Sequence, residues 1–213
     1  MRKLSFIFLL IIITAGNGIN MSDHNSNTIV GLNKEEKVYL LKLVRSTITH
    51  YLQTGKLIES THDSDKLKEK FGVFVTLHKN GKLRGCIGYI EGIDALHNAV
   101  VVMAHSAAFR DPRFPPVDMD EVDDLEIEIS VLSPLKKIEK IDEITVGQHG
   151  LVIKQGLSRG LLLPQVAPEW GWDRKEFLEQ TCQKAGLPKN AWEDQQTEIY
   201  IFSAEIFNEK DFK

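Results

Sequence analysis

Apolar and polar positions alternate with a two-residue period in several stretches, and this period is typical of β-strands. Residues 125–132 alternate between apolar side chains and Glu or Ser, which predicts a strand with one buried face. Apolar, β-branched runs at residues 71–77 and 83–90 flank Asn80-Gly81, a strong hairpin signal. These stretches therefore predict a hairpin and a third strand.

A similar pattern returns in the second half of the chain. Residues 151–154 and 161–163 predict a second hairpin around a turn between Gly156 and Gly160. Residues 199–206 predict one last strand.

Three stretches instead show helical spacing. Asn33 and Glu36 form a capping-box pattern, and the apolar spacing of residues 34–52 predicts an amphipathic helix that begins there. Residues 94–109 predict a helix that is capped by Asp94 and stopped by Pro112. Residues 174–185 predict a helix that closes at Gly186.

Residues 71–132 and 150–206 share one order of elements: hairpin, helix, strand. Gly72 matches Gly150 and Leu83 matches Leu161 at the same offset of 78 residues. A degenerate internal duplication explains this order economically. We therefore predict an α+β fold of two repeats, flanked by helices, with the sheets of both halves joined into one core.

Composition sets broad limits on the class of protein. The 213 residues, with 42% hydrophobic and 26% charged residues, suit one globular domain, which we place at residues 33–208. The net charge is −4, and the sequence contains no cluster of basic residues. Non-specific nucleic-acid binding is therefore not expected.

The first twenty residues resemble a secretory signal: Arg2 and Lys3, a short apolar run, then small residues. The run is too short to span a bilayer as a standard helix, so no integral membrane span is expected in the mature chain. A start at Met1 implies export, to the periplasm or outside the cell. A start at Met21, with a polar lead-in at residues 21–32, implies a cytoplasmic protein.

The two cysteines cannot form the disulfide framework of a small secreted domain. Cys182 lies in a predicted helix, where a buried, apolar role is expected. We find no paired Cys-x-x-Cys spacing, metalloprotease helix or glycine-rich phosphate loop, so no metal or cofactor is expected.

Leu83-Arg84-Gly85-Cys86-Ile87-Gly88 places a reactive residue type inside a predicted strand. Arg84, Cys86 and Gly88 face one way and the other three residues face the opposite way. A guanidinium near a thiol favours the thiolate. Gly85 and Gly88 would leave the backbone open to close approach by a ligand.

This hexapeptide resembles the signature of the AMMECR domain family, whose bacterial members are called AmmeMemoRadiSam system protein A. Four later stretches also match the family pattern: residues 111–116, 128–132, 163–167 and 182–187. The resemblance covers residues 33–207. It implies a barrel-like, mostly antiparallel sheet from two repeats, and partners that are Memo-like and radical S-adenosylmethionine proteins. The molecular activity of the family is not established.

Several residues are candidates for a site, each with a structural alternative. Cys86 is a nucleophile, redox thiol or modification site, or else a small residue packed in a strand. His149 is the candidate base, or else satisfies a loop backbone. Arg84 binds an anion or stabilises a thiolate, or else pairs with Asp111 or Glu128. Asp111 and Arg113 lie in a segment that the resemblance places beside Cys86.

Two function classes follow from these residues. In one, Cys86, assisted by Arg84 and by His149 or a carboxylate, acts on a small or peptide substrate in a modification pathway. In the other, the chain is a non-catalytic binding or adapter module for the same partners. The oligomeric state is left open by the sequence.

Overall fold

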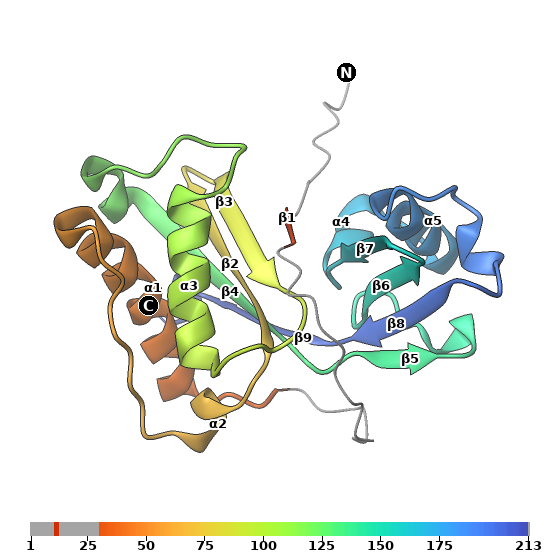
Figure 1. Cartoon of the computed structure of the whole chain (residues 1–213), viewed down its shortest axis with the longest axis horizontal. Helices are drawn as coiled ribbons and strands as arrows, with labels where there is room; N and C mark the ends of the chain where they lie inside the picture. Colours follow the sequence, from red (N-terminus) through yellow and green to blue (C-terminus); the bar gives the residue numbers. More distant parts are fainter. Residues whose placement is uncertain (1–10, 13–29, 213) are drawn as a thin grey trace. The chain divides into compact units, whose positions relative to one another are not determined.

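The computed structural model describes residues 11–12 and 30–212, and these residues form two compact units (Figure 1). Unit 1 holds residues 11–12, 32–130 and 206–212, and unit 2 holds residues 30–31 and 131–205. The predicted signal at residues 1–20 and the lead-in at residues 21–32 fall almost entirely outside the described residues. Among the helices that are described, none is both long and apolar enough to cross a membrane.

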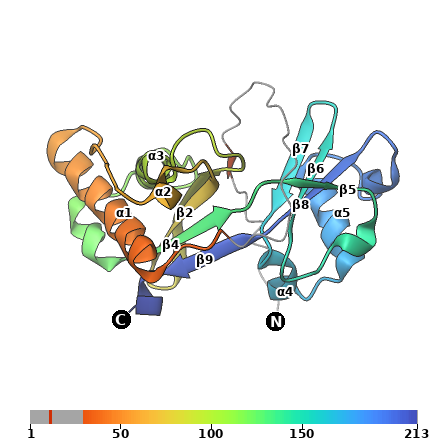
Figure 2. The ribbon, with the colours of Figure 1, turned by 90° about the horizontal axis from the view of Figure 1, so that it is seen from below.

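Unit 1 is a sheet with helices packed on it. The strand order is β1-β3-β2-β4-β9, in which β1 runs parallel to β3 and β2 pairs antiparallel with β3. α3 packs against β2 and β3, and α1 packs against α3 (Figures 1 and 2). The bounds of the strands are β1 Ile11–Ile12, β2 Gly72–Lys79, β3 Lys82–Tyr89, β4 Leu125–Leu132 and β9 Ala204–Asn208. Those of the helices and 3-10 turns are α1 Lys34–Thr54, α2 Asp65–Lys68, α3 Leu96–Phe109, η1 Met119–Asp124 and η4 Glu209–Phe212.

The local signals explain where most of these elements begin and end. The Asn33 side chain accepts from the Glu36 N–H and the Glu36 side chain accepts from the Asn33 N–H, so the predicted capping box is confirmed. Asn80 and Gly81 have φ angles of 53° and 70°, the left-handed pair that a two-residue hairpin turn requires.

The cap predicted for α3 is wrong. The N-cap is Ala95. The Asp94 carboxylate accepts hydrogen bonds from the Ala95 N–H and from the Asn98 side-chain amide, but it does not cap a backbone N–H of the first turn of the helix. The Leu96 N–H instead donates to the backbone carbonyl of Glu69. A long-range backbone contact thus satisfies a donor that the sequence pattern assigned to a local side chain.

Unit 2 is a four-stranded antiparallel sheet in the order β5-β8-β6-β7, with α5 packed against β6 and β7 (Figure 2). Its core is built from residues of the sheet and of α5, among them Leu151, Ile153, Phe177, Leu178 and Ile201. The strands are β5 Lys136–Ile138, β6 Gly150–Gln155, β7 Ser158–Leu162 and β8 Glu198–Phe202. The helices and 3-10 turns are η2 Ile141–Glu143, α4 Val166–Trp170, α5 Arg174–Lys184 and η3 Ala191–Glu193.

The predicted α+β class and the repeated order of elements are confirmed. Unit 1 runs β2, β3, α3, β4, and unit 2 runs β6, β7, α5, β8. The strands belong to two sheets, and those of the described residues close no barrel. The single strand predicted at residues 199–206 is wrong, because the chain leaves one sheet after Phe202 and enters the other at Ala204.

Candidate functional site

Cys86 lies in the middle of β3 and is buried in unit 1. It is 3% exposed, and its sulfur lies 3.2 Å from the Thr76 hydroxyl on the paired strand β2. Burial raises the pKa of the Cys86 thiol to about 11, although the hydrogen bond with Thr76 and the charge of Arg113 act in the opposite direction. The thiol side of β3 is therefore enclosed, which fits the alternative that Cys86 is a small residue packed in a strand.

Asp111 and Arg113 grip the backbone of Cys86. The Asp111 carboxylate accepts from the Cys86 N–H at 2.9 Å, and Arg113 Nη2 donates to the Cys86 carbonyl at 3.1 Å. Arg113 also binds both oxygens of Asp111 through Nε and Nη2, at 2.8 and 2.6 Å. We call Asp111 and Arg113 the clamp, because together they satisfy both backbone groups of one residue of the strand.

The clamp also determines the ionisation of its own carboxylate. Burial would raise the pKa of Asp111, but the hydrogen bonds from Arg113 and from the Cys86 N–H outweigh it and hold the pKa below its usual value. Asp111 is therefore an anion that is fully engaged by its neighbours. This arrangement does not suit a general base, which needs a pKa nearer neutrality.

Arg84 binds the loop that follows the clamp. Its Nε and Nη2 atoms donate to the two oxygens of Glu121 at 3.1 and 2.7 Å, and Nη1 donates to the Pro115 carbonyl at 2.9 Å. The pairing predicted with Asp111 or Glu128 is thus replaced by one with Glu121. The hydrogen bond from Arg84 is the largest cause that lowers the pKa of Glu121, to about 2.

Gly85 and Gly88 do provide close approach, but to atoms of the protein itself. A Cβ on Gly85 would lie 2.1 Å from the Ala107 carbonyl oxygen of α3, and one on Gly88 would lie 2.1 Å from the Phe74 ring. These glycines therefore allow internal packing, and the space predicted for a ligand is occupied.

His149 and Cys182 both lie in unit 2, whereas Cys86 lies in unit 1. His149 Nδ1 accepts a hydrogen bond from the Thr145 N–H at 3.1 Å, and burial lowers the pKa of the ring. This contact fits the alternative that His149 satisfies a loop backbone. Cys182 is 0% exposed within α5, so its predicted burial is confirmed.

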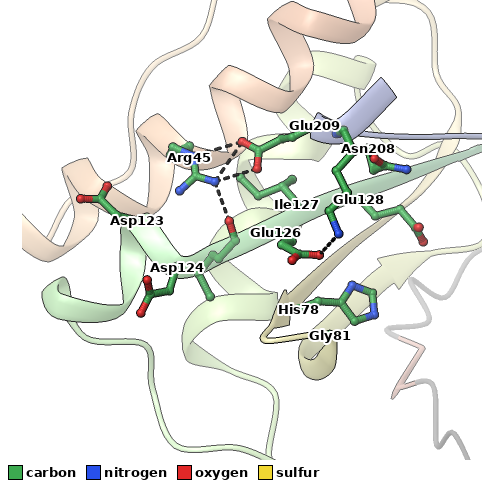
Figure 3. Close-up of a pocket in the computed structure, with 12 residues that line it drawn as sticks. Arg45, His78, Gly81, Asp123, Asp124, Glu126, Ile127, Glu128, Asn208 and Glu209 are labelled. Atoms are coloured by element: carbon green, nitrogen blue, oxygen red, sulfur yellow. Dashed lines mark hydrogen bonds and ion pairs between the residues drawn. The ribbon is translucent and has the colours of Figure 1, made fainter. Parts of the chain in front are cut away.

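Glu128 lines a pocket in unit 1 with a volume of about 520 Å³ (Figure 3). The pocket is bounded by η1, β4, the tip of the β2–β3 hairpin and η4. Five carboxylates line it: Asp123, Asp124, Glu126, Glu128 and Glu209. Two permanent cations also line it, and each is paired there: Arg45 with Glu209 at 2.8 Å and Lys210 with Glu126 at 2.7 Å.

The excess of carboxylates makes the pocket complementary to a cationic group. His78 adds little positive charge, because burial lowers the pKa of its ring. Within residues 11–12 and 30–212, no group of three or more His, Cys, Asp or Glu side chains is arranged to hold a metal ion. The chemistry that this pocket supports is recognition of an amine or a guanidinium.

Two parts of this arrangement were missed at the sequence level. Glu121 follows Asp118 at capping-box spacing, and this signal marks a helical turn without indicating Arg84 as a partner. The pocket gathers residues from α1, β4 and η4, which are far apart in sequence. Only the tertiary fold brings them together.

Comparison with known proteins gives consistent matches along most of the chain. The family model described as AMMECR1 matches residues 41–207. A protein of Methanopyrus kandleri is 47% identical, over 84% of this chain and 91% of its own length. A protein of Methanothermobacter thermautotrophicus is 46% identical, over 84% and 96%. The crystal structure of an uncharacterized protein from Pyrococcus horikoshii matches with a TM-score of 0.76 at 48% identity, over 81% of this chain and 90% of that one.

Proposed function

Because the chain belongs to the AMMECR1 family, we propose that it is a non-catalytic binding component of a modification pathway. Its partners in this proposal are the Memo-like and radical S-adenosylmethionine proteins that the family resemblance implies. One observation carries the choice of a binding role over a catalytic one: the thiol of Cys86 is buried and its pKa is raised to about 11.

The thiolate is the nucleophilic form of cysteine, and a raised pKa lowers the fraction of thiolate at neutral pH. With a pKa of about 11, about one thiol in ten thousand is ionised at neutral pH. The neighbouring groups that would assist catalysis are also engaged, since Arg84 binds Glu121 and Asp111 binds Arg113. These contacts support a structural role for the motif.

The acidic pocket is the surface that we assign to partner binding. It lies in unit 1, and its carboxylates are suited to a lysine or arginine side chain of a partner. Replacing Glu128 by Gln removes one of these charges. In a binding assay at low salt, we expect the variant to associate more slowly with a partner that uses this pocket.

The second candidate function is that of an active thiol, with Cys86 as the nucleophile. One observation favours it: the Thr76 hydroxyl lies 3.2 Å from the sulfur. A hydroxyl donor at this distance stabilises a thiolate. The two functions differ in the reactivity that they require of Cys86.

Thiol alkylation measured against pH separates them. The chain that begins at Met21 is compared with its Cys86→Ser and Cys182→Ser variants, so that the alkylation signal of each cysteine can be assigned. A binding component predicts that Cys86 is alkylated only as the protein unfolds. Reaction of the folded protein with an apparent pKa well below the value of about 8.5 for a free thiol would instead establish the active thiol.

A further inference from the structure

The outer edge of β3, on the side away from β2, is the feature that neither function uses. At Cys86 both backbone groups point to this edge, because the N–H donates to Asp111 and the carbonyl accepts from Arg113. The clamp therefore occupies this position of the edge as a neighbouring strand would.

Gly88 is the next residue whose backbone points the same way. Backbone groups alternate in direction along a strand, so residues two apart share an edge. The pairing of β2 with β3 is regular here, with Thr76 opposite Cys86 and Phe74 opposite Gly88. The irregularity of this pair lies farther along, between Leu77 and His78. The N–H and carbonyl of Gly88 therefore point to the outer edge.

At this point the edge is paired with a strand of the same chain. β1 runs parallel to β3, with Ile11 opposite Ile87 and Ile12 opposite Gly88. Both of these pairs lie directly beyond the clamped residue Cys86.

We infer that the outer edge of β3 beyond the clamp is a strand-addition site, and that its occupant is β1, Ile11–Ile12 of this chain. Main-chain hydrogen bonds hold such an added strand, while the clamp occupies the Cys86 position of the same edge. Ile11 and Ile12 lie in an apolar run without charge or proline, which suits an edge-pairing strand.

This inference does not depend on the proposed function, because it concerns neither the thiol nor the acidic pocket. It has a direct consequence for the two start sites. A chain that begins at Met1 carries its own occupant, whereas a chain that begins at Met21 leaves the Gly88 position of the edge unpaired by this segment.

Amide hydrogen exchange measured by NMR tests the site. The exchange of the Gly88 N–H is compared in the chain begun at Met1 and in the chain begun at Met21. We expect exchange to be slower by about tenfold or more when the N-terminal segment is present. The Cys86 N–H is the internal control, because it donates to Asp111 in both forms.

A pair of variants of the full chain separates strand pairing from simple coverage of the edge. Ile11→Pro with Ile12→Pro removes main-chain donors with which β1 binds β3, so we expect β1 to separate from the edge. Its carbonyl acceptor is then withdrawn from the Gly88 N–H, and we expect fast exchange at Gly88 to return. Ile11→Val with Ile12→Val keeps the backbone and the β-branched shape, and we expect slow exchange. Equal exchange in the Met1 and Met21 forms overturns the proposal, and so does slow exchange that persists in the proline variant.

Discussion

At the scale of single residues, two arginine–carboxylate pairs organise the motif around Cys86. Arg113 with Asp111 holds the backbone of β3, and Arg84 with Glu121 holds the following loop. Both pairs are bidentate, a geometry that guanidinium groups form well. The charged side chains that suggested catalysis, Arg84 and Asp111, are thus each engaged in an ion pair within the protein.

The first prediction concerns the clamp. Asp111→Ala leaves Arg113 and the Cys86 N–H without their acceptor in a site where Asp111 is buried, and we expect the free energy of unfolding to fall by about 3 kcal/mol. Urea denaturation measures this change. The matched control is Asp123→Ala, an exposed carboxylate of η1, for which a change within about 0.5 kcal/mol is expected. Equal effects of the two variants would contradict a clamp.

The second prediction is a pH dependence of the Arg84–Glu121 pair. The pKa of Glu121 is about 2 in the folded protein, compared with 4.5 for an unperturbed glutamate. The ionised side chain therefore contributes its full stabilisation above pH 4.5, and this stabilisation is lost as the pH falls toward 2. Near neutral pH, we expect the free energy of unfolding of the wild type to exceed that of Glu121→Gln by about 2 kcal/mol. This difference should shrink across that window.

Denaturant titrations at several pH values check the Glu121 prediction. Glu193→Gln, at an exposed position of η3, is the matched control. A difference between wild type and Glu121→Gln that stays constant from pH 6 to pH 2 would show that the charge of Glu121 contributes nothing.

The sequence predicted the chemistry of these residues better than their partners. It placed Arg84 and Cys86 on one face of a strand and Asp111 with Arg113 beside Cys86 by resemblance. It could not indicate Glu121 as the partner of Arg84, because the two residues are 37 positions apart and only the fold brings them together. Nor could it show the burial of Cys86, which depends on what packs over the strand.

At the scale of elements, the contact between β3 and α3 determines where the helix lies. The Ala107 carbonyl occupies the space that a side chain at Gly85 would need. The small residues of α3, including Ala104, Ala107 and Ala108, are buried, as expected for a helix that lies close against its neighbour.

The third prediction tests this contact. Gly85→Ala forces α3 away from the sheet, because the added carbon meets backbone, and we expect a loss of about 3 kcal/mol in thermal or urea unfolding. Gly81→Ala is the control: its Cβ has open space, but its φ of 70° strains an alanine, at a cost of about 1 kcal/mol. A smaller loss for Gly85→Ala than for Gly81→Ala would contradict tight packing there.

Local signals predicted the elements well where local contacts determine them. The helix at residues 34–52, the Asn80-Gly81 hairpin and the strand at residues 125–132 are all present. The failures are at Ala95, where a distant carbonyl satisfies the helix start, and at Ser203, where the chain changes sheets. The Ser203 N–H donates to the Ser133 hydroxyl, a partner 70 positions away.

At the scale of the molecule, unit 2 carries a core of its own. Phe177 and Leu178 of α5 pack with Leu151, Ile153 and Ile201 of the sheet. All three strand pairs of this sheet lie within residues 131–205. The structure divides into two compact units, and the single domain expected at residues 33–208 stays a prediction.

The fourth prediction is that residues 131–205, expressed alone, fold cooperatively. The fragment keeps its whole sheet and α5, so it buries the same apolar cluster. Circular dichroism on heating should show one sigmoidal transition. Phe177→Ala costs about 4 kcal/mol in such a core, so this variant of the fragment should be unfolded. A wild-type fragment with the amide spectrum of a random coil would contradict an independent core.

The grip of Asp111 and Arg113 on the backbone of Cys86 has a consequence for how related sequences diverge. The clamp bonds to main-chain atoms of position 86, so the thiol itself is free to drift to serine or alanine as long as Asp111 and Arg113 stay together. Substitutions at those two positions should arise jointly. In descendants of this chain, Cys86 would then be replaced more readily than Asp111 or Arg113.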